Sequence, residues 1–299
     1  MFFDIHAHAY KYPYPISRKN GEYRFIFPTP EQLMSIHDAA GIERAVLLPL
    51  VSSEVYVPQS TDEIIEICNC SNGRFIPFCN VDPRVLTNTS DAPIGILLEY
   101  YKNLGCQGLG EVLPNLEFAD LKMQNLFYHC QNVGFPLLFD ITGTSGYGYG
   151  IYDEKGLPQL DSMLTKFNRL IFIGHGPAFW AEIAKIKQGE DRRGYPNSKV
   201  EEEGIVPKLM RNHKNLWVDL SAGSGSNAML RDTEHAIHFL NEFWDRIMFG
   251  TDICFNEKYS YGIIEFLNAL LAENKLSLEK YNAIAYKNAE KLLGSVNVI

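Results

Sequence analysis

The chain opens with Phe2-Phe3-Asp4-Ile5-His6-Ala7-His8, an apolar stretch that ends in two histidines. Its length and composition indicate a buried β-strand. Because successive side chains of a strand point to opposite faces, His6 and His8 lie on one side, where two imidazoles can bind a single cation. The stretch therefore predicts a metal centre at the downstream end of the first strand.

Further apolar runs follow, separated by segments in which apolar residues have helical spacing. The helical segments include Glu31–Ala40, Asp62–Cys70, Leu121–Val133 and the tail Leu276–Leu293. The eight predicted strands are Phe2–His6, Arg44–Leu50, Phe75–Val81, Gln107–Val112, Pro136–Ile141, Leu170–His175, Leu216–Leu220 and Ile247–Asp252. These units predict an α/β protein with a single domain over residues 1–299, a closed (β/α)8 TIM barrel. The alternative, an open doubly wound sheet, lacks support because no Gly-x-Gly-x-x-Gly motif follows the first strand.

The composition limits the partners that the protein can have. Its 299 residues carry a formal net charge of -9, which disfavours nucleic acid and favours a small-molecule substrate. The six scattered cysteines predict reduced thiols rather than a disulfide framework or a zinc knuckle. The N-terminus lacks the pattern of a secretory signal, and no apolar run approaches the roughly 20 residues needed to cross a bilayer. We therefore expect a cytoplasmic protein that does not bind membranes.

Reactive groups in a barrel of this kind project from the carboxyl ends of the strands. The polar residues predicted there are His6, His8, Glu111, Asp140, His175 and Asp252. This mixture of imidazoles and carboxylates can bind zinc or a similar divalent ion and leave a position for water. A single such residue has simpler explanations, since Glu111 could cap a helix and Asp140 could anchor a loop. The set as a whole favours a metal centre, because gathered carboxylates repel one another without a cation.

Four short motifs occur in order over almost the whole chain. They are Asp4-Ile5-His6-Ala7-His8, Gly108-Leu109-Gly110-Glu111, Phe172-Ile173-Gly174-His175-Gly176 and Gly250-Thr251-Asp252. Together they resemble the amidohydrolase superfamily, and in particular the amidohydrolase-related branch that contains aminocarboxymuconate-semialdehyde decarboxylase. The resemblance implies a (β/α)8 barrel with a divalent metal, usually zinc.

The same resemblance implies roles for individual residues. His6, His8 and Asp252 would hold the metal, and His175 matches a histidine that contacts the metal-bound water in decarboxylase-like members. Glu111 matches a carboxylate that bridges two metals in some hydrolytic branches; we expect one ion, with a binuclear centre as the alternative. The family histidine at the end of the fifth strand is replaced here by Asp140. An aspartate ligand would favour a harder ion such as Mn²⁺, unless the change has weakened metal binding.

The expected chemistry depends on a cation that lowers the pKa of bound water and polarises a carbonyl oxygen. Asp252 would accept the proton of the water and pass it to the leaving group, while His175 would orient the water or stabilise charge. The leading function is hydrolysis of a C–N or C–O bond in a small carbonyl compound. The alternatives are non-oxidative decarboxylation of an aromatic or unsaturated acid, and a non-catalytic barrel that has lost its metal.

Two aromatic segments, Tyr10–Pro15 and Gly146–Tyr152, follow predicted strands. They predict an apolar rim for a planar substrate, or alternatively a lid packed on the barrel. The charged segment Gly189–Gly204 predicts a solvated loop or a subunit contact, and analogy with other barrels favours a homodimer. The predicted substrate contacts are Arg18, as a partner for a carboxylate, and Tyr147 and Trp180.

Overall fold

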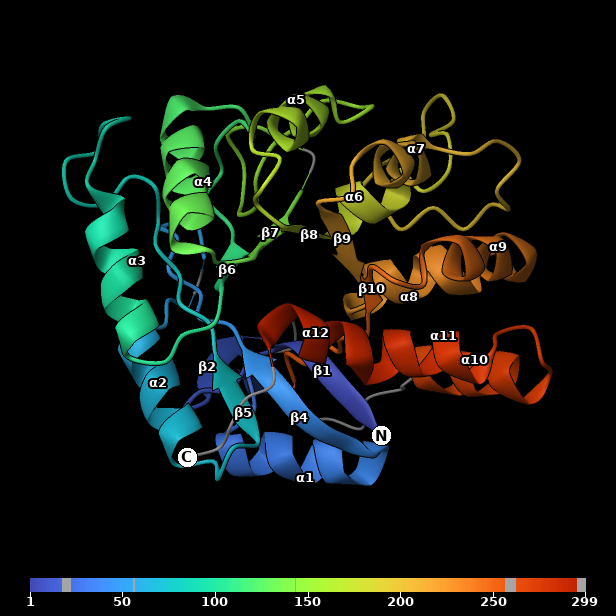
Figure 1. Cartoon of the computed structure of the whole chain (residues 1–299), viewed down its shortest axis with the longest axis horizontal. Helices are drawn as coiled ribbons and strands as arrows, with labels where there is room; N and C mark the ends of the chain where they lie inside the picture. The colour runs from blue at the N-terminus through green and yellow to red at the C-terminus, as the bar shows by residue number, and fades with distance from the viewer. Residues whose placement is uncertain (18–22, 56, 143, 256–261, 295–299) are drawn as a thin grey trace.

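Parallel strands form a ring in the computed structural model, which describes residues 1–17, 23–55, 57–142, 144–255 and 262–294. Helices lie outside this ring (Figure 1). Each of the eight predicted strands is present in the described residues, although most are shorter than the sequence predicted. The ring consists of β1 (Phe2–Ala7), β4 (Ile42–Leu47), β5 (Phe75–Pro77), β6 (Leu109–Val112), β7 (Leu137–Asp140), β8 (Phe172–His175), β9 (Leu216–Asp219) and β10 (Ile247–Met248).

Contacts at two places close the ring between its two hydrogen-bonded sheets, which have the strand orders β1-β4-β5 and β10-β9-β8-β7-β6. Cys79, just beyond β5, forms a parallel bridge with Leu109 of β6. On the opposite side, the Ile5 N–H of β1 donates to the Phe249 carbonyl oxygen at 3.0 Å. The predicted (β/α)8 barrel is therefore confirmed.

The helices follow the strands in the alternation that the sequence predicted. Local signals set their ends: Thr29 and Gln32 form a capping box at the start of α1, and Gly41, at φ 71°, ends it. Asp120 caps α4 and Gly134, at φ 81°, terminates it, so α4 has the bounds that the sequence predicted. The helices are α1 (Pro30–Ala40), α2 (Thr61–Asn69), α3 (Ile94–Asn103), α4 (Leu121–Val133), α5 (Pro158–Lys166), α6 (Pro177–Ala181), α7 (Ile205–Asn212), α8 (Ala222–Leu230), α9 (Thr233–Phe243), α10 (Gly262–Ala272), α11 (Leu278–Asn282) and α12 (Asn288–Leu293), with a π-helical turn at Ala283–Lys287.

One core cluster gathers side chains from seven of the eight strands. Its members are Phe3, Ile5, Val46, Leu48, Ile76, Phe78, Leu138, Ile173, Trp217, Met248 and, from α12, Ala289. The remaining strand, β6, contributes no side chain to this cluster, and glycines at and beside it let the core side chains approach the backbone. A Cβ at Gly108, next to that strand, would lie 2.4 Å from the Phe78 ring. A Cβ at Gly110 would lie 2.9 Å from the Leu138 Cβ. The two glycines of the Gly108-Leu109-Gly110-Glu111 motif are thus required by packing beneath the carboxyl ends of the strands.

The two ends of the predicted pattern differ from the observed elements. The predicted strand Ile247–Asp252 stops at Met248, because the next N–H, that of Phe249, donates to the Ile284 carbonyl oxygen instead of to a neighbouring strand. The predicted helical tail Leu276–Leu293 begins at Leu278, after Ser277 has capped it, and contains the π-helical turn.

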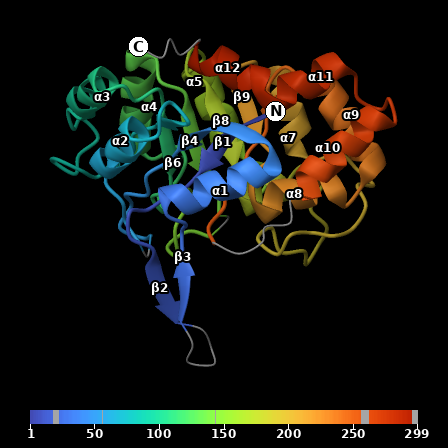
Figure 2. The same ribbon diagram turned by 90° about the horizontal axis from the view of Figure 1, so that it is seen from below.

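A hairpin, β2 (Tyr14–Ser17) and β3 (Tyr23–Ile26), was not predicted. Its strands pair antiparallel, with Tyr14 opposite Ile26, and Figure 2 shows that it projects from the barrel. Pro15 and the neighbouring aromatic residues gave this segment the composition of a loop. Within the part of the chain that the structure describes, no helix combines the length and the apolar composition needed to cross a lipid bilayer.

Candidate metal centre

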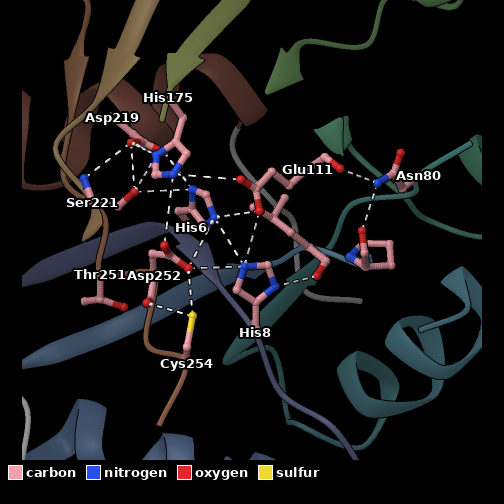
Figure 3. A network of polar contacts seen from close by, with 12 residues as sticks. His6, His8, Asn80, Glu111, His175, Asp219, Ser221, Thr251, Asp252 and Cys254 are labelled. Atoms are coloured by element: carbon pink, nitrogen blue, oxygen red, sulfur yellow. Dashed lines mark hydrogen bonds and ion pairs between the residues drawn. The ribbon is translucent and has the colours of Figure 1, made fainter. Parts of the chain in front are cut away.

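The structure brings the six predicted metal-binding residues to one end of the barrel. His6 lies in β1 and His8 one residue beyond it, Glu111 lies in β6, and Asp140 and His175 are the last residues of β7 and β8. Asp252 lies on the segment after β10. All except Asp252 are almost fully buried, and five of them are drawn in Figure 3.

Four atoms form a compact group that we call the four-donor cluster: His6 Nε2, His8 Nε2, Glu111 Oε2 and Asp252 Oδ1. The two imidazole nitrogens lie 3.3 Å apart. Glu111 Oε2 is 3.4 Å from His6 Nε2 and 3.6 Å from His8 Nε2. Asp252 Oδ1 is 3.7 Å and 3.4 Å from the same two atoms. Tetrahedral bonds of about 2.0–2.1 Å place donor atoms about 3.3–3.4 Å apart, so these five distances suit a zinc-sized ion.

The second nitrogen of each imidazole is occupied by a protein acceptor. His8 Nδ1 lies 2.9 Å from the Leu48 carbonyl oxygen. His6 Nδ1 and His175 Nδ1 each lie 2.9 Å from the carboxylate of Asp219. A proton on Nδ1 leaves the Nε2 lone pair of a neutral imidazole available to a cation, as histidine ligands require.

Backbone contacts hold Asp252 against the first strand. Its N–H donates to the His6 carbonyl oxygen at 2.8 Å, and its φ of 51° lies in the left-handed region. Asp4 supports the same junction, because its Oδ1 accepts the N–H of His6 at 3.0 Å and that of Thr251 at 2.9 Å. The carboxylate of Asp252 is therefore placed by the contact between the first and last barrel segments.

His175 lies at the edge of the four-donor cluster. Its Nε2 is 3.8 Å from Glu111 Oε1 and 4.0 Å from Asp252 Oδ2, so it faces the second oxygen of each carboxylate. Its ring centroid lies 4.4 Å from that of His6. The position suits a group that contacts a bound molecule beside an ion.

Asp140 differs from its neighbours because its Oδ1 is buried without a hydrogen-bond partner among the described residues. Burial, and then repulsion from Glu111, raises the pKa of Asp140 to about 7. One atom each of Glu111, Asp140 and His175 lie within 4.8 Å of one another, and the same holds for His6, His175 and Asp252 and for His6, His8 and Glu111. Gly176 allows the close approach, since a Cβ there would lie 2.0 Å from Asp140 Oδ1. Asp140 therefore lies beside the cluster, and its oxygen makes no loop-anchoring bond.

Imidazoles and carboxylates balance one another's charge in this site. Burial would lower the pKa of His6, but Glu111 and Asp252 hold it well above its usual value. Burial would likewise raise the pKa of Glu111, but the imidazoles, His6 first, hold it well below its usual value. At His175, burial would lower the pKa, but the Asp219 carboxylate outweighs this effect and the pKa is raised to about 9. Binding of a divalent cation would displace protons from these imidazoles.

Asp219 is a buried residue of the site that the sequence analysis missed. It ends β9 just as Asp140 ends β7 and His175 ends β8, so its place at a strand end was a usable signal. Its two oxygens contact two different histidines, and Ser221 Oγ donates to Oδ1 at 2.8 Å. Figure 3 shows these contacts on the side of His6 and His175 that faces away from Glu111.

A pocket of about 120 Å³ opens onto the centre. Carboxylates line its inner end and apolar side chains much of its wall, so it suits a small molecule with an apolar part. Besides His8, Glu111, Asp140, His175 and Asp252, the lining residues are Phe27, Leu50, Val55, Val57, Leu113, Tyr149, Pro177, Tyr195, Ala222, Ser224 and Cys254.

The predicted substrate contacts correspond poorly to this lining. Arg18 lies outside the described residues, and Tyr147 is 73% exposed, whereas Tyr149 lines the pocket. Trp180 is 1% exposed and packs against aromatic side chains of the core, which corrects the predicted substrate contact. The reason is that α6 begins immediately after β8 and turns Trp180 into the helical layer. Tyr195, from the segment expected to be a solvated loop, lines the pocket instead.

Comparison with known proteins agrees with this architecture. A protein-family model described as amidohydrolase matches residues 3–295. None of the curated proteins compared with the sequence matches it significantly. The barrel is similar to an amidohydrolase from Burkholderia multivorans with bound zinc, at 14% identity, a TM-score of 0.58 and coverage of 98% of this chain and 99% of that one.

Two further solved structures are similar in fold. A probable 2-pyrone-4,6-dicarboxylic acid hydrolase from Acinetobacter baumannii, with citric acid bound, has 13% identity and a TM-score of 0.57, covering 98% of this chain and 99% of that one. A 5-carboxyvanillate decarboxylase from Novosphingobium aromaticivorans, in complex with manganese and 4-hydroxy-3-methoxy-5-nitrobenzoic acid, has 17% identity and a TM-score of 0.55, covering 88% and 79%.

Proposed function

The chain belongs to the amidohydrolase family, and from this premise we propose that it is a metal-dependent hydrolase that cleaves a C–N or C–O bond in a small carbonyl compound. The observation that carries the proposal is the four-donor cluster, in which two imidazoles and two carboxylates surround a space of ionic size. The expected product of the reaction contains an oxygen atom from water.

We propose one divalent ion, held by His6, His8, Glu111 and Asp252, with zinc as the first candidate and manganese as the second. A zinc-bound relative and a manganese-bound relative with the same fold support these two ions. The group of Glu111, Asp140 and His175 could hold a second ion, which is the alternative to a single one. When bound, such a cation polarises a carbonyl oxygen and lowers the pKa of a water molecule that it coordinates.

The two oxygens of Asp252 face different partners, which suits a dual role. Oδ1 belongs to the four-donor cluster, whereas Oδ2 lies 4.0 Å from His175 Nε2. Oδ2 can therefore accept a proton from the nucleophilic water and return it to the leaving group. His175, whose Nδ1 is held by Asp219, presents Nε2 to the same space and can orient the water or stabilise developing negative charge.

The pocket lining favours an uncharged substrate over a polyanion. Glu111, Asp140 and Asp252 line it, and the described lining residues include no lysine or arginine. A substrate carboxylate would need a cation from elsewhere, such as Arg18, to offset this negative charge. The apolar wall, with Phe27 and Leu113, would bind the hydrocarbon part of the substrate.

The second candidate function is non-oxidative decarboxylation of an aromatic or unsaturated acid. It is favoured by the similarity in fold to the manganese-bound 5-carboxyvanillate decarboxylase. The third alternative, a barrel without metal or activity, would leave the clustered donors unexplained.

The cysteines of the described residues form no disulfide, which supports a reducing compartment such as the cytoplasm.

Metal analysis and product analysis test the proposal together. We expect purified protein loaded with Zn²⁺ or Mn²⁺ to hold about one ion per chain, and His6→Ala to lose it. His213→Ala is the matched control, because His213 contacts Asp161 rather than any residue of the four-donor cluster. The loaded enzyme is then assayed on a panel of neutral lactones, amides and aromatic acids in ¹⁸O-labelled water. Label in the product supports hydrolysis, released carbon dioxide without label supports the lyase, and a wild-type protein that binds no ion contradicts both.

A further inference from the structure

Asp219 contacts the Nδ1 atoms of both His6 and His175, whereas Glu111 and Asp252 lie near the Nε2 atoms of these rings. It is fully buried at the end of β9, and its Oδ2 lies 2.9 Å from His6 Nδ1 while its Oδ1 lies 2.9 Å from His175 Nδ1. The two histidines come from strands far apart in the sequence, β1 and β8, the first and sixth strands of the barrel. One carboxylate therefore joins a residue of the four-donor cluster to the residue beside it.

Ser221 fixes this carboxylate in turn. Its Oγ donates to Asp219 Oδ1 at 2.8 Å, and its N–H donates to the same oxygen at 3.3 Å. Among the described residues, Oδ2 contacts His6. The assignment of each oxygen to one ring is thus determined by the chain following β9.

We propose that Asp219 is a positioning residue that sets the orientation of His6 and His175 together, by accepting an Nδ1–H from each. This inference rests on the metal-dependent function proposed above. A carboxylate only accepts hydrogen bonds, so both rings must carry their proton on Nδ1 and turn Nε2 toward the centre. The arrangement holds the two ring centroids 4.4 Å apart.

Replacing Asp219 with asparagine, which has the same shape, distinguishes a role in hydrogen bonding from a role in packing. Asparagine at position 219 has the same shape, but it offers one acceptor oxygen and one donor NH₂ group. It can accept from only one of the two rings, and the other ring must present an unprotonated Nδ1 or lose the bond. That second ring then carries its proton on Nε2, where it cannot bind an ion. This substitution keeps the size of the side chain and removes its negative charge, so it disturbs one of the two imidazoles without leaving a cavity.

The experiment compares Asp219→Asn with Ser221→Ala, which removes the contacts of Ser221 Oγ to Asp219 and to Nδ1 of His6 and His175 but keeps the carboxylate. The Zn²⁺ affinity of each folded variant is measured by competition with a chelator, and the hydrogen-bonded Nδ1–H protons of His6 and His175 are observed by ¹H–¹⁵N NMR. We expect Asp219→Asn to bind Zn²⁺ about 10–100-fold more weakly than the wild type and to lose one of the two Nδ1–H signals. Ser221→Ala is expected to keep both signals and to bind Zn²⁺ within a few-fold of the wild type.

Two Nδ1–H signals and unchanged Zn²⁺ affinity in Asp219→Asn would overturn the inference. The NMR measurement separates this outcome from failure of the proposed function. A wild-type protein that bound no Zn²⁺ would contradict the metal-dependent function, whereas the Nδ1–H signals of the metal-free protein would still show whether Asp219 holds both rings. Loss of one signal in the metal-free variant would support the positioning role, and retention of both would overturn it.

Discussion

At Asp140, the surroundings in the folded protein disfavour the ionised form of the carboxyl group. Its pKa is raised to about 7 by burial and by Glu111, whereas a carboxyl in the unfolded chain has a pKa of about 3.9. Between about pH 4 and pH 7 the unfolded chain therefore releases a proton that the folded protein keeps. The contribution of Asp140 to the stability of the metal-free protein should therefore fall as the pH rises through this range and level off above about pH 7.

We predict that Asp140→Asn removes this loss of stability. At pH 4 the variant and the wild type should have similar free energies of unfolding. At pH 8 the metal-free variant should be more stable by a few kcal/mol, since each unit of pKa shift corresponds to about 1.4 kcal/mol. Urea unfolding of both proteins across this pH range measures the difference.

Asp38→Asn, which changes a carboxylate at a largely exposed position, is the matched control and should show no such trend. Added Zn²⁺ should narrow the difference at pH 8, because a nearby cation stabilises the charged form of Asp140. Equal stabilities of Asp140→Asn and wild type at pH 8 without metal would contradict the assigned environment of Asp140.

Individual residues also show where sequence reasoning succeeded and where it could not. Alternation along a strand was enough to place His6 and His8 side by side, since that property is local. Trp180 could not be placed, because the face that a short helix turns to the barrel depends on packing against α8 and α9. Asp219 was missed for a different reason: its signal, a carboxylate ending an apolar run, was present but was not counted.

At the scale of elements, the sequence predicted the strands and helices whose boundaries depend on nearby residues. The cap at Asp120 and the left-handed Gly134 define α4 without any tertiary contact. The early end of β10 depends instead on the contact of Phe249 with Ile284, a residue far along the chain. The hairpin of β2 and β3 was missed because its two strands pair only with each other and contain Pro15.

The capping box of α1 provides a prediction at this scale. Thr29→Ala removes the acceptor for the Gln32 N–H and should lower the free energy of unfolding by about 1 kcal/mol. Thr29→Ser keeps the hydroxyl and should remain within about 0.5 kcal/mol of the wild type. Urea unfolding of the two variants checks this, and equal losses for both would show that the methyl group rather than the hydroxyl stabilises the helix start.

At the scale of the whole molecule, the eight-fold alternation of strands and helices predicted the closed barrel, and the barrel predicted that the strand ends converge.

Exposed apolar side chains on α3 and α4 bear on how copies of the chain assemble. Ile96 and Tyr100 of α3 are 68% and 54% exposed, and Leu121 and Tyr128 of α4 are 65% and 53% exposed. The two helices pack beside each other (Figure 1) and contain one acidic and two basic side chains, Glu99, Lys102 and Lys122.

We predict that this α3/α4 face joins two copies of the chain. Two chains of net charge -9 repel each other, so a face that carries little of that charge is the favourable place for them to meet. Tyr100→Glu should convert the dimer to a monomer in sedimentation velocity at micromolar concentration. Leu278→Glu, at a 61% exposed position on α11, should leave the dimer intact. A monomeric wild type would contradict the prediction.

The four-donor cluster draws His6 and His8 from the start of the barrel and Asp252 from its last segment. A ribosome-bound nascent chain exposes the two histidines early, but it cannot complete the set until the eighth strand has been translated. The complete set of four donors would therefore exist only once synthesis and closure of the barrel have finished.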